Sequence, residues 1–224
     1  MWNSMKRKRS VRNRRARRCL FLILLALLAL LLIWPRTVHL EGLVSPYAIL
    51  VDADSGEAVA EKEADVSIYP ASMTKVMTAL LALEANPDLE QPVTLPEDIF
   101  PEMRAEGASM AGFRPGETAT VRDLLYGALL PSGAECCEAL AREVSGSEDA
   151  LVEMMNQKAA ELGMRSTHFC NPTGLHDLEH VSTVRDMARL LRAAMQNENF
   201  RAILSARSYT VPATDLHPEG FTMT

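Results

Sequence analysis

The feature that most constrains this chain is an uncharged run of 16 residues, Cys19 to Trp34, which directly follows a strongly basic arm. The first 18 residues hold nine of the chain's 23 Lys and Arg and contain no acidic residue. A basic arm before an apolar run indicates a membrane-targeting segment whose arm stays in the cytoplasm. Bulky residues follow the run where a cleavage site needs small ones. We therefore expect an uncleaved signal anchor, with secretion after cleavage as the alternative.

This anchor divides the chain into four parts. We expect a basic cytoplasmic arm (residues 1–18), a single-pass transmembrane segment (19–34), a linker (35–46) and one extracytoplasmic domain (47–224). Outside the arm, the remaining 14 Lys and Arg face all 29 Asp and Glu. Since nucleic-acid binding needs basic residues on the folded domain, this distribution argues against a nucleic-acid partner.

The folded part is predicted to begin with a β-hairpin and to continue mainly as helices. Residues 47–60 alternate in polarity around the turn sequence Asp54-Ser55-Gly56, which is typical of a hairpin. A helix that is apolar on most faces should run from Ser72 to Asn86, because Pro87 ends it. Further elements are expected as helices over 120–130, 134–144, 147–163 and 182–197, and as a strand within 206–214. This order favours an α+β domain.

Ser72 and Lys75 are the first candidate catalytic pair. At i and i+3 of a helix they project from one face, so the amine can approach the serine oxygen. Apolar neighbours should desolvate the amine and lower its pKa, which would let it take the serine proton. The pair alone is weak evidence, because Ser-x-x-Lys occurs by chance about once in a chain of this size. The alternative is a serine that caps the helix beside a lysine that extends to solvent.

Four blocks of sequence carry a resemblance: YPASMTKVMTALLALE, GFRPGETATVRDLLYGALLPSGAE, ELGMRSTHFCNPTGLHD and HVSTVRDMARLL. Together they make residues 45 to 224 similar to the serine-type D-alanyl-D-alanine carboxypeptidases, low-molecular-mass penicillin-binding proteins with a β-lactamase-like fold; Ser-x-x-Lys is a motif of penicillin-binding proteins. That fold combines an antiparallel sheet with a helical cluster.

The resemblance also implies roles for individual residues. Ser72 would be the acylated nucleophile, Lys75 its base, and Ser132 the start of a second motif whose hydroxyl relays a proton. Gly133 and Ala134 would fall in the substrate-binding part of that motif. The implied substrate is the D-Ala-D-Ala end of a peptidoglycan stem peptide, β-lactams would be covalent inhibitors, and no cofactor or metal is implied.

Two departures from the family pattern affect these expectations. Ala134 stands where the family usually has Asn, and its methyl group cannot donate to a substrate carbonyl. The family's third motif, Lys-Thr-Gly or Lys-Ser-Gly, does not occur in the 224 residues. We therefore expect a chain truncated before that strand, with an incomplete sheet, an open edge and poor catalysis.

Two other functions stay open at this point. The first is a non-catalytic, membrane-anchored relative that binds peptidoglycan. The second is an exported zinc peptidase that uses His176 and His180, whose i, i+4 spacing would suit a metal on a helix. The three cysteines of the domain, Cys136, Cys137 and Cys170, are expected to be small buried hydrophobes without a disulfide framework.

Overall fold

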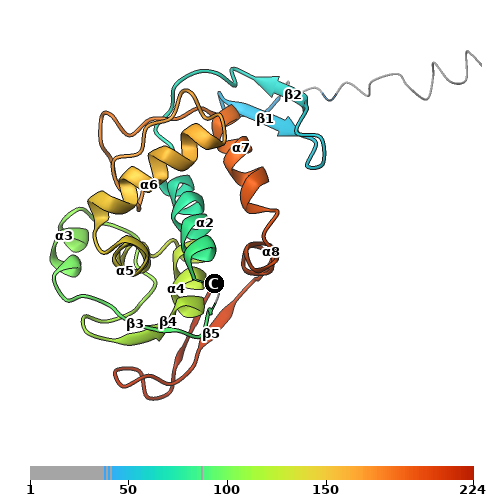
Figure 1. Cartoon of the computed structure of the whole chain (residues 1–224). Helices are drawn as coiled ribbons and strands as arrows, with labels where there is room; N and C mark the ends of the chain where they lie inside the picture. The colour runs from blue at the N-terminus through green and yellow to red at the C-terminus, as the bar shows by residue number, and fades with distance from the viewer. Residues whose placement is uncertain (1–37, 39, 41, 87) are drawn as a thin grey trace, which may run out of the picture. The chain divides into compact units, whose positions relative to one another are not determined.

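The central element of the fold is a buried helix. The computed structural model describes residues 38, 40, 42–86 and 88–224, and Figure 1 shows helix α2 (Lys75–Ala85) running among the other helices. Eight of its 11 residues are buried, and it contacts α4, α5, α6, α7 and α8. A helix that is apolar on every face is stable only when neighbours cover it all round. The sequence-based prediction of this buried helix is confirmed.

The surrounding helices begin where their capping residues predict. Thr120 forms a reciprocal capping box with Asp123, and the side chains of Ser147 and Thr183 accept backbone N–H bonds at the next helix starts. The helices that follow η1 (Ala71–Thr74) and α2 are α3 (Ile99–Ala105), α4 (Val121–Leu129), α5 (Ala134–Ser145), α6 (Glu148–Glu161), α7 (Val184–Ala194) and α8 (Glu198–Leu204).

Two of these helices were not predicted. Helix α3 is short and has no side-chain cap that would mark its start. The helix expected over 182–197 ends at Ala194, and the side chain of Asn197 then accepts the backbone N–H groups of Asn199 and Phe200 to begin α8. The predicted helix is therefore confirmed as α7, three residues shorter at its end, and α8 is an additional helix that begins after its cap at Asn197.

The strands form three separate two-stranded antiparallel sheets: β1 (Ala48–Val51) with β2 (Ala58–Lys62), β3 (Pro92–Thr94) with β4 (Thr118–Thr120), and β5 (Tyr209–Val211) with β6 (Phe221–Met223). The first pair confirms the predicted hairpin. The expectation of a single sheet is wrong for the described residues, because β5 pairs with β6. Tyr209 stacks on Tyr126 at 3.8 Å between ring centroids, and its hydroxyl donates to Asp123 Oδ1, so β5 is held against α4.

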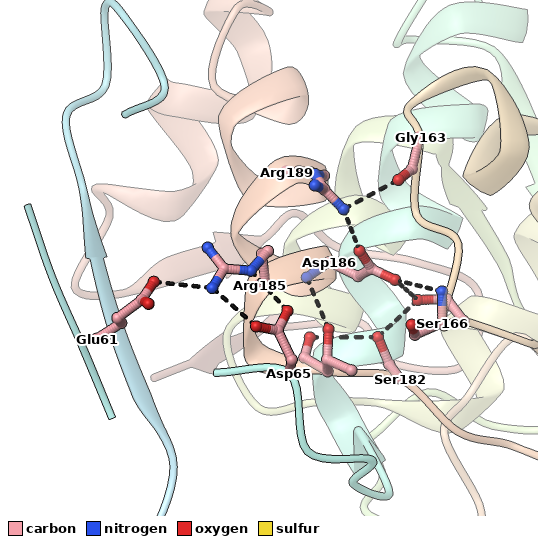
Figure 2. A network of polar contacts seen from close by, with 10 residues as sticks. Glu61, Asp65, Gly163, Ser166, Ser182, Arg185, Asp186 and Arg189 are labelled. Carbon is pink, nitrogen blue, oxygen red and sulfur yellow. Dashed lines mark hydrogen bonds and ion pairs between the residues drawn. The ribbon is translucent and has the colours of Figure 1, made fainter. Parts of the chain in front are cut away.

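A polar network ties the β1–β2 hairpin to the start of α7 (Figure 2). Arg185 donates to Asp65 at 2.6 Å and to Glu61 at 2.8 Å, while the neighbouring Asp186 accepts the Ser166 backbone N–H at 2.9 Å. Asp186 is buried and also bonds Arg189, which donates to the Gly163 carbonyl. The first turn of α7 thus fixes the hairpin on one side and the turn after α6 on the other.

The expected cytoplasmic arm and membrane segment, and residues 35–37, 39 and 41 of the linker, lie outside the described residues. Over the part of the chain that the structure describes, no helix combines the length and the apolar character that crossing a bilayer requires.

Candidate active site

Ser72 and Lys75 lie together at the start of the central helix. Ser72 belongs to the single 3-10 turn η1, one turn before the α-helix proper, and its side chain is exposed, whereas Lys75 is buried. Lys75 Nζ lies 3.2 Å from Ser72 Oγ and donates to the Thr173 carbonyl oxygen at 2.6 Å. The predicted i, i+3 contact is therefore present, although the helix starts three residues later than expected.

The surroundings of Lys75 favour its neutral form. Burial lowers the pKa of its amine, and the nearby thiols of Cys137 and Cys136 and the carboxyl of Glu135 oppose that shift only in part. Burial also raises the pKa of the Cys137 thiol to about 12, which keeps that thiol uncharged at neutral pH. No ion pair joins Lys75 to a carboxylate of the described residues, so little holds the proton on the amine. Such an amine can act as a base toward a hydroxyl.

Ser132 completes a cluster of three polar groups. Its hydroxyl donates to Ser72 Oγ at 2.8 Å, from a residue 60 positions further along the chain. Ser132 has φ +65°, a left-handed conformation that costs a non-glycine residue roughly 1–3 kcal/mol. The next two N–H groups hold it there: Gly133 donates to the Gly127 carbonyl and Ala134 to the Ser109 carbonyl, each at 2.8 Å.

Gly133 and Ala134 contribute in different ways. A Cβ on Gly133 would lie 2.6 Å from the Ala111 side chain. The loop that contains Ala111 can therefore pack against the backbone of residue 133 only because that residue is glycine. Ala134 is the first residue of α5 and lines a small cavity of about 160 Å³ beside Ser72. The other residues that line it are Ala71, Lys75, Gly107, Ala108, Ser109, Thr173, Gly174 and Leu175.

The turn Asn171–Gly174 is the part of the site that sequence reasoning missed. Asn171 Oδ1 accepts from the backbone N–H groups of Thr173 and Gly174, and this closes the turn so that the Thr173 carbonyl faces Lys75. Gly174 has φ +79°, and a Cβ there would lie 1.9 Å from the Ala71 carbonyl oxygen. The Asn-Pro-Thr-Gly sequence predicts a turn, but it does not predict which residue the turn contacts.

The two histidines do not form a metal site. His180 is buried; its Nδ1 accepts the Cys170 backbone N–H at 3.2 Å, so Nε2 carries the proton and donates to Thr74 Oγ1 at 2.8 Å. His176 packs edge-on against Tyr69 in an irregular loop. The zinc hypothesis needed both on one helical face. Within the described residues no group of three or more His, Cys, Asp or Glu is arranged to hold a metal ion.

The predicted burial of the cysteines is confirmed for Cys136 and Cys137 but not for Cys170. Cys136 and Cys137 are buried on α5, Cys170 is half-buried, and all three are free thiols.

Comparison with known sequences identifies the family. The sequence model of the D-alanyl-D-alanine carboxypeptidase family matches residues 36–214. The chain belongs to this family. D-alanyl-D-alanine carboxypeptidase DacF of Bacillus subtilis is 36% identical over 152 residues, which are 68% of this chain and 39% of the relative. DacB2 of Mycobacterium tuberculosis is 38% identical over 167 residues, 74% of this chain and 55% of the relative. The chain thus spans about half the length of these relatives, or less.

Solved structures agree with this assignment. The DD-transpeptidase of Streptomyces K15 superposes with a TM-score of 0.74 at 31% identity, over 80% of this chain and 71% of the other. A penicillin-binding protein homologue from Mycobacterium tuberculosis gives a TM-score of 0.72 at 33% identity, over 84% and 69%. The predicted penicillin-binding-protein fold is confirmed, with small antiparallel sheets in place of the single sheet that was expected.

Proposed function

We propose that this chain is a serine-type D-alanyl-D-alanine carboxypeptidase that acts on the D-Ala-D-Ala end of peptidoglycan stem peptides through an acyl-enzyme on Ser72. One observation carries the proposal: the hydroxyls of Ser72 and Ser132 and the buried amine of Lys75 form a hydrogen-bonded chain beside a cavity. A nucleophile, a base and a second hydroxyl within reach of each other are the elements that acyl transfer requires.

The proton path follows from these contacts. A neutral Lys75 keeps one N–H for the Thr173 carbonyl, and its lone pair accepts the Ser72 proton across the 3.2 Å contact. Ser72 Oγ then attacks the carbonyl carbon of the penultimate D-Ala, and the peptide C–N bond breaks. The Ser132 hydroxyl, 2.8 Å from Ser72 Oγ, gives its proton to the departing amine of the last D-Ala and takes up in turn the proton that Lys75 holds, so the Lys75 amine is neutral again. Water hydrolyses the ester and frees Ser72.

Ala134 favours a second candidate, a relative that binds peptidoglycan without cleaving it. Its methyl group lines the cavity where the family pattern places an amide. Loss of one preorganised donor typically lowers a rate by about 10²–10³-fold. We therefore propose slow acylation, and we place the domain outside the cell on a single-pass anchor, as the basic arm and apolar run predict.

Labelling with a fluorescent penicillin tests the proposal. The unaltered chain should acquire one covalent label per molecule, and Ser72→Ala should acquire none, because β-lactams are expected to acylate that hydroxyl. The matched control is Ser205→Ala, the same substitution at an exposed serine that ends α8. A label that persists in Ser72→Ala contradicts the assignment of the nucleophile. An unaltered chain that binds peptidoglycan but takes no label supports the non-catalytic candidate.

A further inference from the structure

Glu135 is a buried carboxylic acid that directly follows Ala134 and that the proposed proton path does not use. It is the second residue of α5, and its side chain is fully buried. Its Oε1 accepts two successive backbone N–H groups, from Ala111 at 2.7 Å and from Gly112 at 3.0 Å. One side-chain oxygen on α5 therefore holds two adjacent donors of a loop that comes earlier in the chain.

The loop bound by this carboxyl group also forms one wall of the cavity beside Ser72. We call residues 107–113 the wall loop, and three of its members line that cavity: Gly107, Ala108 and Ser109. The wall loop is joined to the start of α5 by the backbone as well, because Ala134 donates its N–H to the Ser109 carbonyl at 2.8 Å. The wall loop thus connects the side chain of one residue of α5 with the backbone of the residue before it.

Ser132 depends on these contacts for its position. Its backbone is left-handed, with φ +65°, and such a residue keeps that conformation only where its surroundings hold it. One of the two backbone bonds that follow it, from the Ala134 N–H, ends on the wall loop. A displaced wall loop would therefore withdraw support from the Ser132 hydroxyl, which donates to Ser72 Oγ at 2.8 Å.

The second oxygen of Glu135 indicates that this contact does not need a charge. Oε2 is buried and has no hydrogen-bond partner among the residues that the structure describes. Burial raises the pKa of the carboxyl group, and the surrounding backbone N–H groups, that of Gly112 first, oppose the shift only in part. An ionised oxygen without a partner costs more to bury than a neutral one. The contact with the wall loop is made by Oε1, and an amide oxygen can accept the same two N–H groups.

We propose that Glu135 is a positioning residue, which holds Ser132 in place for proton transfer by fixing the wall loop through Oε1. This inference rests on the proposed function, because that function gives the Ser132 hydroxyl its role. Within the described residues, no hydrogen bond joins Glu135 to Ser72 or Lys75, so its effect on the reaction passes through the loop.

Amide hydrogen exchange followed by NMR tests the contact without any ligand. Glu135→Gln keeps an oxygen acceptor at the same distance along the side chain, whereas Glu135→Met fills a similar volume without one. The Ala134 N–H should exchange at least about tenfold faster in Glu135→Met than in the unaltered chain, and at an unchanged rate in Glu135→Gln. The internal control is the Leu130 N–H, which donates to the Tyr126 carbonyl and should exchange normally in both variants.

Penicillin labelling tests whether the contact serves the reaction. Glu135→Met should label at least about tenfold more slowly than the unaltered chain, because Ser132 is displaced, and Glu135→Gln should label at the unaltered rate. The control for lost stability is Asp123→Leu, which removes another buried carboxyl group that accepts a backbone N–H. Asp123 lies in the first turn of α4, whereas Ser132 follows that helix. The folded fraction of Asp123→Leu should therefore label normally.

A second variant keeps the test decisive if Glu135→Met does not fold. Glu135→Asp retains the acid but is one CH₂ shorter, so it should reproduce the fast exchange at Ala134 and the slow labelling that Glu135→Gln does not show. Unchanged Ala134 exchange in the folded Met or Asp variant, or labelling that is equally slow in Glu135→Gln or Asp123→Leu, overturns the inference. An unaltered chain that takes no label is the separate failure of the proposed function.

Discussion

Replacing Gly174 with alanine should break the contact that holds Lys75 in place. The new Cβ would lie 1.9 Å from the Ala71 carbonyl oxygen, whereas real Cβ contacts stay beyond 3.0 Å, so the turn must move by about 1 Å. A movement of that size lengthens the 2.6 Å bond from Lys75 Nζ to the Thr173 carbonyl beyond hydrogen-bonding range. Losing it costs roughly 1.5–3 kcal/mol, in addition to roughly 1–2 kcal/mol for an alanine at φ +79°.

The unfolding free energy of Gly174→Ala, measured by urea denaturation, should therefore fall by roughly 2.5–5 kcal/mol. Gly146→Ala is the matched control, since Gly146 has a similar φ of +85° but a Cβ added there would meet no atom within 4 Å. Gly146→Ala should lose only the roughly 1–2 kcal/mol of unfolding free energy that an alanine at positive φ costs. The penicillin-labelling rate should fall by about 10²-fold in Gly174→Ala alone, because the base is displaced by about 1 Å. Equal losses of stability in the two variants, with unchanged labelling, would refute the reasoning.

Three further outcomes are expected. Burial lowers the pKa of Lys75, so the labelling rate should rise with pH through that pKa and level off above it; Lys75→Arg, which stays charged, should not label at any pH. Ala134→Asn should raise the labelling rate by up to about 10²-fold, whereas Ala134→Leu, which adds volume without a donor, should not. Folding raises the pKa of the Glu138 carboxyl group from 4.5 to about 8, so the folded state loses stability as the pH rises between those two values. In urea denaturation, Glu138→Gln should therefore be more stable than the unaltered chain by roughly 2–4 kcal/mol at pH 8 and equally stable at pH 4. The control Glu153→Gln should match the unaltered chain at both pH values.

Local features of this fold were predictable from the sequence. The spacing of Ser72 and Lys75 fixes their contact within one turn, and Thr120, Ser147 and Thr183 mark helix starts because a cap acts on its own next residues. The hairpin was also predictable, since its turn residues lie between its two strands.

Contacts between distant segments were not predictable in the same way. Thr173 reaches Lys75 across 98 residues, and no periodicity or cap encodes that pairing. Ser132 entered only through resemblance to a family, because its left-handed backbone and its bond to Ser72 depend on Gly127 and Ser109 in another part of the chain. The single sheet that the resemblance implied is wrong for a related reason: β5 pairs with β6 and Tyr209 packs on α4, and the strand pattern does not specify such partners.

The backbone around Ser72 also has an evolutionary consequence. Among the described residues, three that are not glycine adopt positive φ, and two of them contact or adjoin the proposed nucleophile, Ser72: Ala71 precedes it in the chain and Ser132 donates to its hydroxyl. Each such residue costs roughly 1–3 kcal/mol of folding free energy. Populations selected for heat resistance should therefore accumulate glycine at position 71, because glycine there removes the backbone strain without removing a functional side chain. Glycine at position 132 would remove the hydroxyl that donates to Ser72, so under the proposed mechanism serine should be retained there together with its backbone strain.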